Sequence, residues 1–342
     1  MKILITGGAG YIGSHTIIEM LETTSWDILS ADNFFNSFPT IFDRIKTITG
    51  NSISNYEIDL CNKSFTKKIF SENPDIQGVI HFAALKSVPE SVANPELYYH
   101  NNNESLKNVL SCLKEFGVEN FIFSSSCSVY GNINTLPVNE DTPLQKAQSP
   151  YGHTKQMGEE IIAEFSKSNP DIHSIALRYF NPVGAHTSGL IGEHPRRKCD
   201  NLVPAITETA IGMAEHFIVH GDNYNTRDGS CIRDYVHVSD IANAHILALK
   251  YLMKEKVKNN FEIINLGTGK GISVMEAINA FEKVSGKKLN YIIGPRREGD
   301  VESIFSDSSK AQRILGWAPK YNIEQMMESA WKWQLNLSRA NQ

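Results

Sequence analysis

Short apolar runs alternate along the first half of the chain with longer segments whose apolar residues recur at helical spacing, as in Tyr11–Leu21 and Leu97–Phe116. Alternation of this kind is typical of βαβ units and of a parallel sheet covered by helices on both faces. We therefore expect a doubly wound α/β fold with a sheet of about seven strands. The predicted strands are Lys2–Thr6, Asp27–Ala31, Gln77–His81, Asn120–Ser124 and His173–Tyr179, with weaker ones at Tyr56–Ile58 and Glu262–Asn265.

The pattern changes after Asn181, where residues 182–235 are rich in Gly, Pro, Asn, His and Arg and show little periodicity. Long irregular segments are usually either functional or disordered, and this one carries Arg, Asn and aromatic residues. We interpret it as a substrate-binding region. Helix and strand patterns return at Ser273–Ser285, Leu289–Ile293, Ser308–Leu315 and Ile323–Leu335.

These changes of pattern predict two domains. Residues 1–181 form the first, to which a strand near 262–265 and the region 233–250 also contribute. Residues 182–342 form a smaller, mixed α/β domain that binds the substrate. The chain length of 342 residues agrees with two domains of about 150 residues or more.

Composition and charge exclude several classes of protein. With 41% hydrophobic and 21% charged residues, the chain is neither disordered nor collagen-like, and a net charge of −5 gives no attraction to nucleic acid or to an anionic membrane. The first apolar run is broken at Gly7 and is too short for a signal peptide, so we expect a cytoplasmic protein. The widely spaced cysteines (Cys61, Cys112, Cys127, Cys199 and Cys231) are expected to be free thiols, and no metal site is expected, with His186 and His194 taken as loop residues.

A glycine-rich loop follows the first predicted strand and opens the first predicted helix, with its glycines at Gly7, Gly10 and Gly13. Glycine permits a tight turn and lets backbone N–H groups approach a pyrophosphate, which the N-terminus of a helix also attracts. Because this loop lies in the first βαβ unit, it predicts a Rossmann-type dinucleotide site.

Polar residues at the ends of the next strands fit the same site. Asp32 follows Gly13 by about 20 residues, the spacing of a carboxylate that binds the adenosine ribose and repels a 2′-phosphate, so we expect NAD as the cofactor. The alternative is that Asp32 only caps a turn. Ligands sit at the carboxyl ends of parallel strands. The further candidates there are Asn33, Asp59, Leu60, Phe82, Ala83 and Ala84.

A serine run and a tyrosine–lysine pair supply candidate catalytic groups. The fifth strand is followed by Ser126, and Tyr151 and Lys155 lie four residues apart, on one face of a helix. A free tyrosine has a pKa near 10, but a nearby ammonium group and a cationic nicotinamide both favour the phenolate. We predict Tyr151 as the catalytic base, Lys155 as the cation that lowers its pKa, and Ser126 as a hydrogen-bonding partner of the reacting hydroxyl.

Further motifs run through nearly the whole chain: TGGAGYIGSHT (6–16), DNFFNS (32–37), VIHFAALKSVPESV (79–92), FIFSSSCSVYG (121–131), SPYGHTK (149–155), LRYFNPVGAH (177–186), NLVP (201–204), RDYVHVSD (233–240), INLGTG (264–269) and PRREGD (295–300). In this order they resemble the extended short-chain dehydrogenase/reductase family, and within it the UDP-glucose 4-epimerases (UDP-galactose 4-epimerases).

The resemblance implies an isomerase of galactose and nucleotide-sugar metabolism that interconverts UDP-galactose and UDP-glucose. Tyr151 would remove the proton of the sugar 4-hydroxyl with the support of Ser126. Hydride would pass from C4 to tightly held NAD, and the 4-keto sugar would turn over and receive the hydride on its other face.

The resemblance also implies roles for single residues, among them arginines that offer planar forks to the substrate diphosphate. Those expected to line the cofactor are Tyr11, Ile12, Asn36, Ser37, Lys86, Asn101, Ser124, Tyr179 and Phe180, beside the residues already named. Those expected to bind the UDP-hexose are Lys86, Ser126, Tyr151, Asn181, Asn201, Leu202, Phe217, Ile218, Val219, Arg233, Arg297 and Asp300.

Some positions depart from the family pattern. Ala84 and Pro89 stand in place of glycines, His153 in place of a lysine, and Asn103–Leu106 in place of Val-Asn-Gly-Thr, which is expected to change helix packing near the cofactor. Ile304 stands where a bulky residue in the family blocks N-acetylhexosamines. Isoleucine is intermediate in size, so UDP-GlcNAc and UDP-GalNAc stay open as substrates.

Three rival functions remain. A 4,6-dehydratase needs a carboxylate pair beside the active-site hydroxyl, where this chain has Cys127 and Ser128. A decarboxylase, or a 4-epimerase of other nucleotide sugars, would share the same groups. A non-catalytic NAD-sensing protein on this fold is the third, because fold alone does not establish activity.

Two predicted helices, Pro95–Phe116 and Tyr151–Lys167, resemble the pair that forms a four-helix dimer interface in the family. Met157, Ile161, Ile162 and Phe165 would supply its apolar residues. The alternative is that these four belong to the core of the chain. We expect a homodimer.

Overall fold

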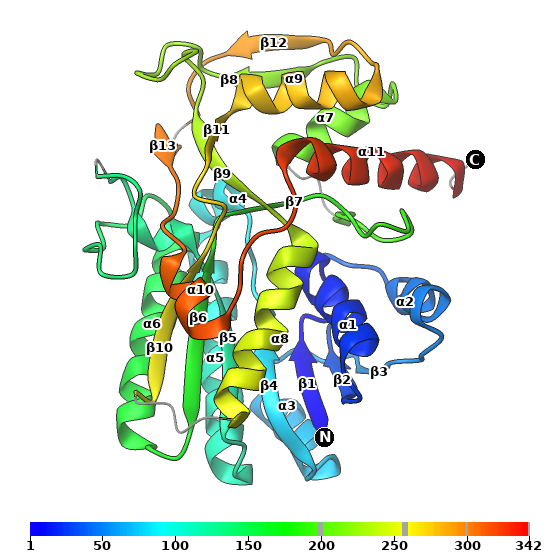
Figure 1. Cartoon of the computed structure of the whole chain (residues 1–342). Helices are drawn as coiled ribbons and strands as arrows, with labels where there is room; N and C mark the ends of the chain where they lie inside the picture. Colours follow the sequence, from blue (N-terminus) through cyan, green and yellow to red (C-terminus); the bar gives the residue numbers. More distant parts are fainter. Residues whose placement is uncertain (134, 197–200, 255–258, 298–299, 341–342) are drawn as a thin grey trace.

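The chain is built around a seven-stranded sheet in which every pair of neighbouring strands is parallel, with the order β10-β6-β5-β4-β1-β2-β3 (Figure 1). Its computed structural model describes residues 1–133, 135–196, 201–254, 259–297 and 300–340. This strand order is that of a Rossmann-type fold extended by one strand. The strands are β1 (Lys2–Thr6), β2 (Asp27–Ala31), β3 (Ser54–Tyr56), β4 (Ile76–His81), β5 (Asn120–Ser126), β6 (His173–Tyr179) and β10 (Phe261–Leu266).

Helices cover both faces of the sheet. The helices on one face are α1 (Tyr11–Thr23), α2 (Ile41–Thr49) and α8 (Val238–Lys254). Those on the other are α3 (Lys63–Glu72), α5 (Pro95–Phe116) and α6 (Pro150–Ser168), with the short α4 (Val88–Ala93) against α5 and α6 and a 3-10 turn at Cys127–Tyr130. No helix in the described ranges is long and apolar enough to cross a membrane.

The strands supply both cores at once because their side chains alternate between the two faces. Ile3 and Ile5 of β1 enter the core beneath α1 and α8, whereas Leu4 enters the core beneath α3 and α5. In β5, Ile122 joins the first core and Phe121 the second. Strands buried on both faces read as continuous apolar runs, which is why the sequence predicted them.

A smaller set of elements lies beyond the carboxyl ends of the sheet strands (Figure 1). One small sheet is formed by β7 (Asn181–Val183), β9 (Ile232–His237), β11 (Gly271–Ser273) and β13 (Ser303–Ile304), and a two-stranded ribbon by β8 (Phe217–His220) and β12 (Tyr291–Gly294). The helices here are α7 (Leu202–Ala210), α9 (Val274–Ser285) and α11 (Ile323–Ala340), and α10 (Ser309–Leu315) packs against α8 and β10.

The expected α/β fold and its seven strands are confirmed, and the domain boundary at residue 181 stays a prediction. The expectation of little regular structure in residues 182–235 is wrong, since α7 and strands β7, β8 and β9 lie there. Helix α7 escaped notice because Pro204 lies within its first turn and its threonines have low helix propensity. Strand β12 starts at Tyr291 rather than Leu289, and α11 extends to Ala340.

A buried ion pair joins α6 to the centre of the sheet. Arg178 of β6 donates two hydrogen bonds to the Glu159 carboxylate, from Nε at 2.9 Å and from Nη2 at 2.6 Å, and the Ser125 hydroxyl of β5 donates a third at 2.5 Å. The side chains of Arg178 and Glu159 are only 2% and 6% exposed. A buried pair of this kind is stable only while both partners are present, because a lone charge would lie unpaired away from water.

Replacing one partner tests this pair. Arg178→Met leaves the Glu159 carboxylate buried without its cation, and we expect the free energy of unfolding to fall by about 3–5 kcal/mol. Urea denaturation at neutral pH measures the change. The control is Lys167→Met at the end of α6, where the pair with Glu164 is exposed and no measurable loss is expected. A loss for Arg178→Met no larger than for the control would contradict the assignment.

Candidate active site

The glycine loop forms a cradle of backbone atoms at the start of α1. Gly7 has a φ of +71°, and a Cβ there would lie 2.8 Å from the Ala83 nitrogen; a Cβ on Gly13 would lie 2.3 Å from the Gly7 carbonyl oxygen. No side chain caps α1 at Gly10. The first backbone N–H groups of the helix have no partner within the helix and carry its positive dipole end, so the loop suits a pyrophosphate.

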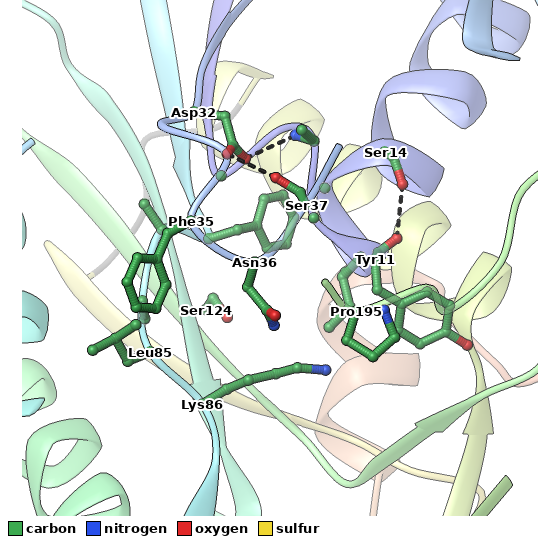
Figure 2. Close-up of a pocket in the computed structure, with 18 of the residues that line it drawn as sticks. Tyr11, Ser14, Asp32, Phe35, Asn36, Ser37, Leu85, Lys86, Ser124 and Pro195 are labelled. Atoms are coloured by element: carbon green, nitrogen blue, oxygen red, sulfur yellow. Dashed lines mark hydrogen bonds between the residues drawn. The ribbon is translucent and has the colours of Figure 1, made fainter. Parts of the chain in front are cut away.

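Asp32 lies at the end of β2, in the groove that the loop opens. Its carboxylate accepts a hydrogen bond from the Ser37 hydroxyl at 3.0 Å (Figure 2). It also accepts hydrogen bonds from the Ala9 nitrogen (3.0 Å) and the Phe34 nitrogen (2.8 Å). Burial raises the pKa of Asp32, and these three hydrogen bonds act against that rise. Asp32 therefore caps the turn through Phe34 and also lines the groove, and its expected contact with the ribose stays a prediction.

One groove of about 480 Å³ runs from the glycine loop along the ends of the sheet strands. Every residue that the sequence placed at the cofactor lines it: Gly7, Gly10, Tyr11, Ile12, Gly13, Asp32, Asn33, Asn36, Ser37, Asp59, Leu60, Phe82, Ala83, Ala84, Lys86, Asn101, Ser124, Tyr151, Lys155, Tyr179 and Phe180. The cradle of glycines, the uncapped helix and the carboxylate at Asp32 together fit a dinucleotide. Figure 2 shows Asn36, Lys86 and Pro195 among the residues that line this groove.

A second cavity of about 550 Å³ adjoins the groove, and Ser126, Tyr151 and Lys86 line it. Ser126 and Tyr151 also line the first groove, so these two side chains lie where the cavities meet. The other expected substrate residues that line the second cavity are Asn181, Asn201, Arg233, Arg297, Asp300 and Ile304.

Four expected substrate residues are not brought to this cavity. Leu202 opens α7, and Phe217, Ile218 and Val219 form β8, where they pair with β12. Phe217 and Val219 are buried in the core around α7 and α9, whereas Ile218 is 45% exposed. Their expected contact with the UDP-hexose therefore stays a prediction.

Lys155 is held by the sheet. Its Nζ donates a 2.6 Å hydrogen bond to the Ser124 carbonyl oxygen and lies 4.9 Å from the centre of the Phe123 ring and 5.9 Å from that of Tyr151. Burial lowers the pKa of Lys155 to about 8, and the negative charge of Glu159, one turn further along α6, acts in the opposite direction. The ammonium group is thus next to the tyrosine, with its position fixed by the backbone of β5.

The expectation that Lys155 and a cationic nicotinamide together lower the pKa of Tyr151 concerns the site with its cofactor bound, and it stays a prediction. In the protein without cofactor, burial raises the pKa of Tyr151 above its ordinary value, and the groups that act against this rise are Ser126 and the Lys86 ammonium. Desolvation disfavours the charged phenolate more strongly than these neighbours favour it. The sequence showed the spacing of Tyr151 and Lys155 but not the desolvation of the phenol.

Charged side chains surround the second cavity. The Asp300 carboxylate accepts two hydrogen bonds from Arg297 (3.1 and 2.9 Å) and lies 3.5 Å from a nitrogen of Arg233. Glu193 lines the first groove, and one of its oxygens accepts hydrogen bonds from two residues of the second cavity, Lys86 through Nζ (3.0 Å) and Asn201 through Nδ2 (2.8 Å). The two arginines offer planar donors for a diphosphate.

Sequence reasoning missed several residues of the groove. Glu193 lies in the segment that showed no periodicity, and Trp333 is an apolar position of α11 like many others. Phe38, Arg44 and His194 also line the groove. Of these residues, only Phe38 could have been suggested by the sequence, because it directly follows the DNFFNS motif (32–37).

Neither disulfides nor metal-binding clusters are found among the described cysteines and histidines. Cys61, Cys112, Cys127 and Cys231 are free, and Cys199 lies outside the described residues. No group of three or more His, Cys, Asp or Glu side chains there could hold a metal ion.

The change at Asn103–Leu106 falls within α5, where it packs against α6. Asn103 is buried, and its amide donates to the Met157 sulfur at 3.7 Å. Ile162 of α6 is fully buried in the core of the chain, whereas Met157, Ile161 and Phe165 are partly exposed. Ile162 therefore belongs to the core of the chain, as the alternative to the dimer interface predicted.

Known proteins resemble this chain over almost its whole length. A family model described as GDP-mannose 4,6 dehydratase matches residues 4–330. The UDP-glucose 4-epimerase of Bacillus subtilis (strain 168) is 46% identical over 336 residues, which are 98% of this chain and 97% of that protein.

Solved structures of UDP-glucose 4-epimerases are also similar to this chain. UDP-glucose 4-epimerase from Bifidobacterium longum, in complex with NAD+ and UDP, has a TM-score of 0.94 and 42% identity, with 98% of each chain covered. The enzyme from Stenotrophomonas maltophila, with bound NAD and formylated UDP-arabinopyranose, has a TM-score of 0.95 and 41% identity, with 99% of each chain covered. The chain therefore belongs to the extended short-chain dehydrogenase/reductase family that the dehydratase model describes and, within it, to the UDP-glucose 4-epimerases.

Proposed function

We propose that this protein is an isomerase that interconverts UDP-galactose and UDP-glucose with a retained NAD. The observation that carries the proposal is the meeting of two cavities at Tyr151 and Ser126, one with the dinucleotide cradle and the other with two arginines. NAD, when bound in the first groove, supplies a hydride acceptor and donor that ends each turnover unchanged.

The chain's own residues bind the nucleotide sugar, orient it and move one proton. Tyr151 takes the proton of the sugar 4-hydroxyl and returns it later, and Ser126 holds that hydroxyl by a hydrogen bond. Lys155 keeps a positive charge near the phenol, fixed by its bond to the Ser124 carbonyl. Arg233 and Arg297 hold the diphosphate, so the sugar stays tethered by its nucleotide while it turns over.

The dehydratase alternative lacks its acid and base at the expected place. Cys127 and Ser128 follow Ser126, and burial raises the pKa of the Cys127 thiol to about 12, so it is a neutral thiol at pH 7. The two carboxylates among the described residues of the second cavity are Glu90, which accepts a hydrogen bond from Tyr98, and Asp300, which binds Arg297. These contacts favour epimerisation over elimination of water.

Further parts of the proposal concern the cell and the assembly. Interconversion of UDP-galactose and UDP-glucose would serve galactose metabolism in the cytoplasm. The protein would act as a homodimer in which α5 and α6, which pack side by side, meet their copies in a four-helix interface. The part-exposed side chain of Met157 on α6 supports this arrangement, whereas Ile161 and Phe165 also pack against the core of the chain.

Conversion of substrate without added cofactor tests the function most directly. Purified protein is incubated with UDP-galactose alone, and the products are separated by chromatography. We expect UDP-glucose, because the retained NAD makes added cofactor unnecessary. No product, even after NAD is supplied, would refute the proposed activity.

Removal of the phenol hydroxyl tests the proton transfer. Tyr151→Phe should lower turnover by about 10²- to 10⁴-fold, because the sugar hydroxyl loses its base. Bound NAD should persist, since the glycine cradle is unchanged. The matched control is Tyr99→Phe on α5, whose hydroxyl pairs with His153 at 3.0 Å outside both cavities and whose loss should leave turnover unchanged. Turnover of Tyr151→Phe near that of the parent would rule Tyr151 out as the base.

The size of residue 304 should decide whether N-acetylated sugars enter. Ile304 is 3% exposed and lines the second cavity. Ile304→Tyr adds bulk there, so kcat/KM for UDP-GalNAc should fall about 10- to 100-fold more than kcat/KM for UDP-galactose. Ile304→Leu, which conserves volume, is the control and should leave the ratio nearly unchanged. Equal losses on both substrates would show that this position does not select the sugar.

A further inference from the structure

Four side chains from three distant parts of the chain form a row along the dinucleotide groove. Phe38 follows β2, and its ring stacks on that of His194, with centroids 4.8 Å apart and planes 24° apart. His194 in turn meets Trp333 of α11 edge-on at 6.1 Å, and the Arg44 guanidinium of α2 lies 4.8 Å above the Trp333 ring. We call Phe38, His194, Trp333 and Arg44 the aromatic latch.

The latch joins two walls of one groove. All four of its side chains line the same groove as the glycine cradle. Phe38 and Arg44 belong to the wall after β2, whereas His194 belongs to the segment after β7, about 150 residues further along the chain. The walls cannot move apart without breaking the ring stack.

Two hydrogen bonds from side chains of the latch to backbone carbonyls hold the segment that carries His194. Trp333 Nε1 donates to the Glu193 carbonyl oxygen at 3.1 Å, and Arg44 donates to the Leu190 carbonyl oxygen at 3.4 Å. A Cβ on Gly192 would lie 2.5 Å from the Trp333 ring, so the segment is pressed closely against α11. These contacts hold Trp333 in place, and His194 packs against its ring.

The electrostatics suit a neutral ring between the walls. Burial and the nearby Arg44 charge lower the pKa of His194, which keeps its imidazole uncharged at neutral pH. An uncharged imidazole stacks on Phe38 without the cost of desolvating a cation. Arg44 instead places its charge over the face of Trp333, where the ring quadrupole attracts it.

We propose that the aromatic latch sets how long the dinucleotide stays in its groove. This inference rests on the proposed function, in which the cofactor leaves each turnover unchanged and has no need to exchange. A contact between the walls must break both when the dinucleotide enters and when it leaves. Loss of the latch should therefore speed entry and exit together, with little change in affinity.

Release of labelled NAD measures the residence time. Parent, Phe38→Ala and His194→Ala are loaded with radiolabelled NAD, and loss of label is followed after a large excess of unlabelled NAD is added. Both variants should release label about 3- to 10-fold faster than the parent, the range expected for one aromatic stack. His194→Phe restores a ring and should release label at nearly the parent rate.

Two further measurements distinguish a latch from a direct contact or from general loosening. The double variant Phe38→Ala/His194→Ala should be no faster than the faster single variant, because both changes remove one contact. A limiting amount of labelled NAD, shared at equilibrium between tagged variant and untagged parent, reports the ratio of their dissociation constants, which should stay within about 2-fold. The control is Phe65→Ala on α3, an aromatic residue that is 51% exposed outside the groove and should leave the release rate unchanged.

Several results would overturn the inference. Release at the parent rate in both alanine variants would mean that the stack does not hold the walls. Faster release with a dissociation constant that rises in proportion would assign these rings to direct contact with the dinucleotide instead. A parent that neither carries NAD as purified nor takes up labelled NAD would overturn the proposed function itself, and the loading step shows this before any variant is compared.

Discussion

The buried pair of Glu159 and Arg178 fixes the register between α6 and the two strands on which the active site depends. Glu159 lies one turn beyond Lys155 and two turns beyond Tyr151 on the same helix face. Its partners are Ser125, one residue before Ser126, and Arg178 of β6. The same three contacts that satisfy a buried carboxylate therefore set where the phenol, the ammonium and the serine hydroxyl meet.

Much of the fold and of the groove could be predicted, because both follow local rules. The strands are buried on both faces, and residues at the carboxyl ends of parallel strands must share one edge of the sheet. No such rule applies to Trp333, Glu193 and His194, because long loops and a distant helix bring them to the groove. The burial that raises the pKa of Tyr151 could not be predicted either, because burial is a property of the folded chain and has no local pattern.

Glu193 binds side chains that line both cavities. Its carboxylate holds Lys86, which lines both cavities, and Asn201, which also lines both. Its backbone carbonyl accepts the Trp333 indole hydrogen bond, so the latch and the substrate cavity share one anchor. Movement of the segment around Glu193 would change the shape of the groove and of the second cavity at the same time.

Asp32 limits how easily the choice of cofactor can change. A dinucleotide with a 2′-phosphate would call for removal of this carboxylate, yet Ala9, Phe34 and Ser37 all donate to it. Phe34 has a φ of +56°, a conformation that a bulky residue adopts only when its surroundings hold it there. A single substitution at Asp32 would thus release a strained turn as well as remove the carboxylate expected to bind the ribose, so a lineage or a designer that altered this preference would have to rebuild the whole turn first.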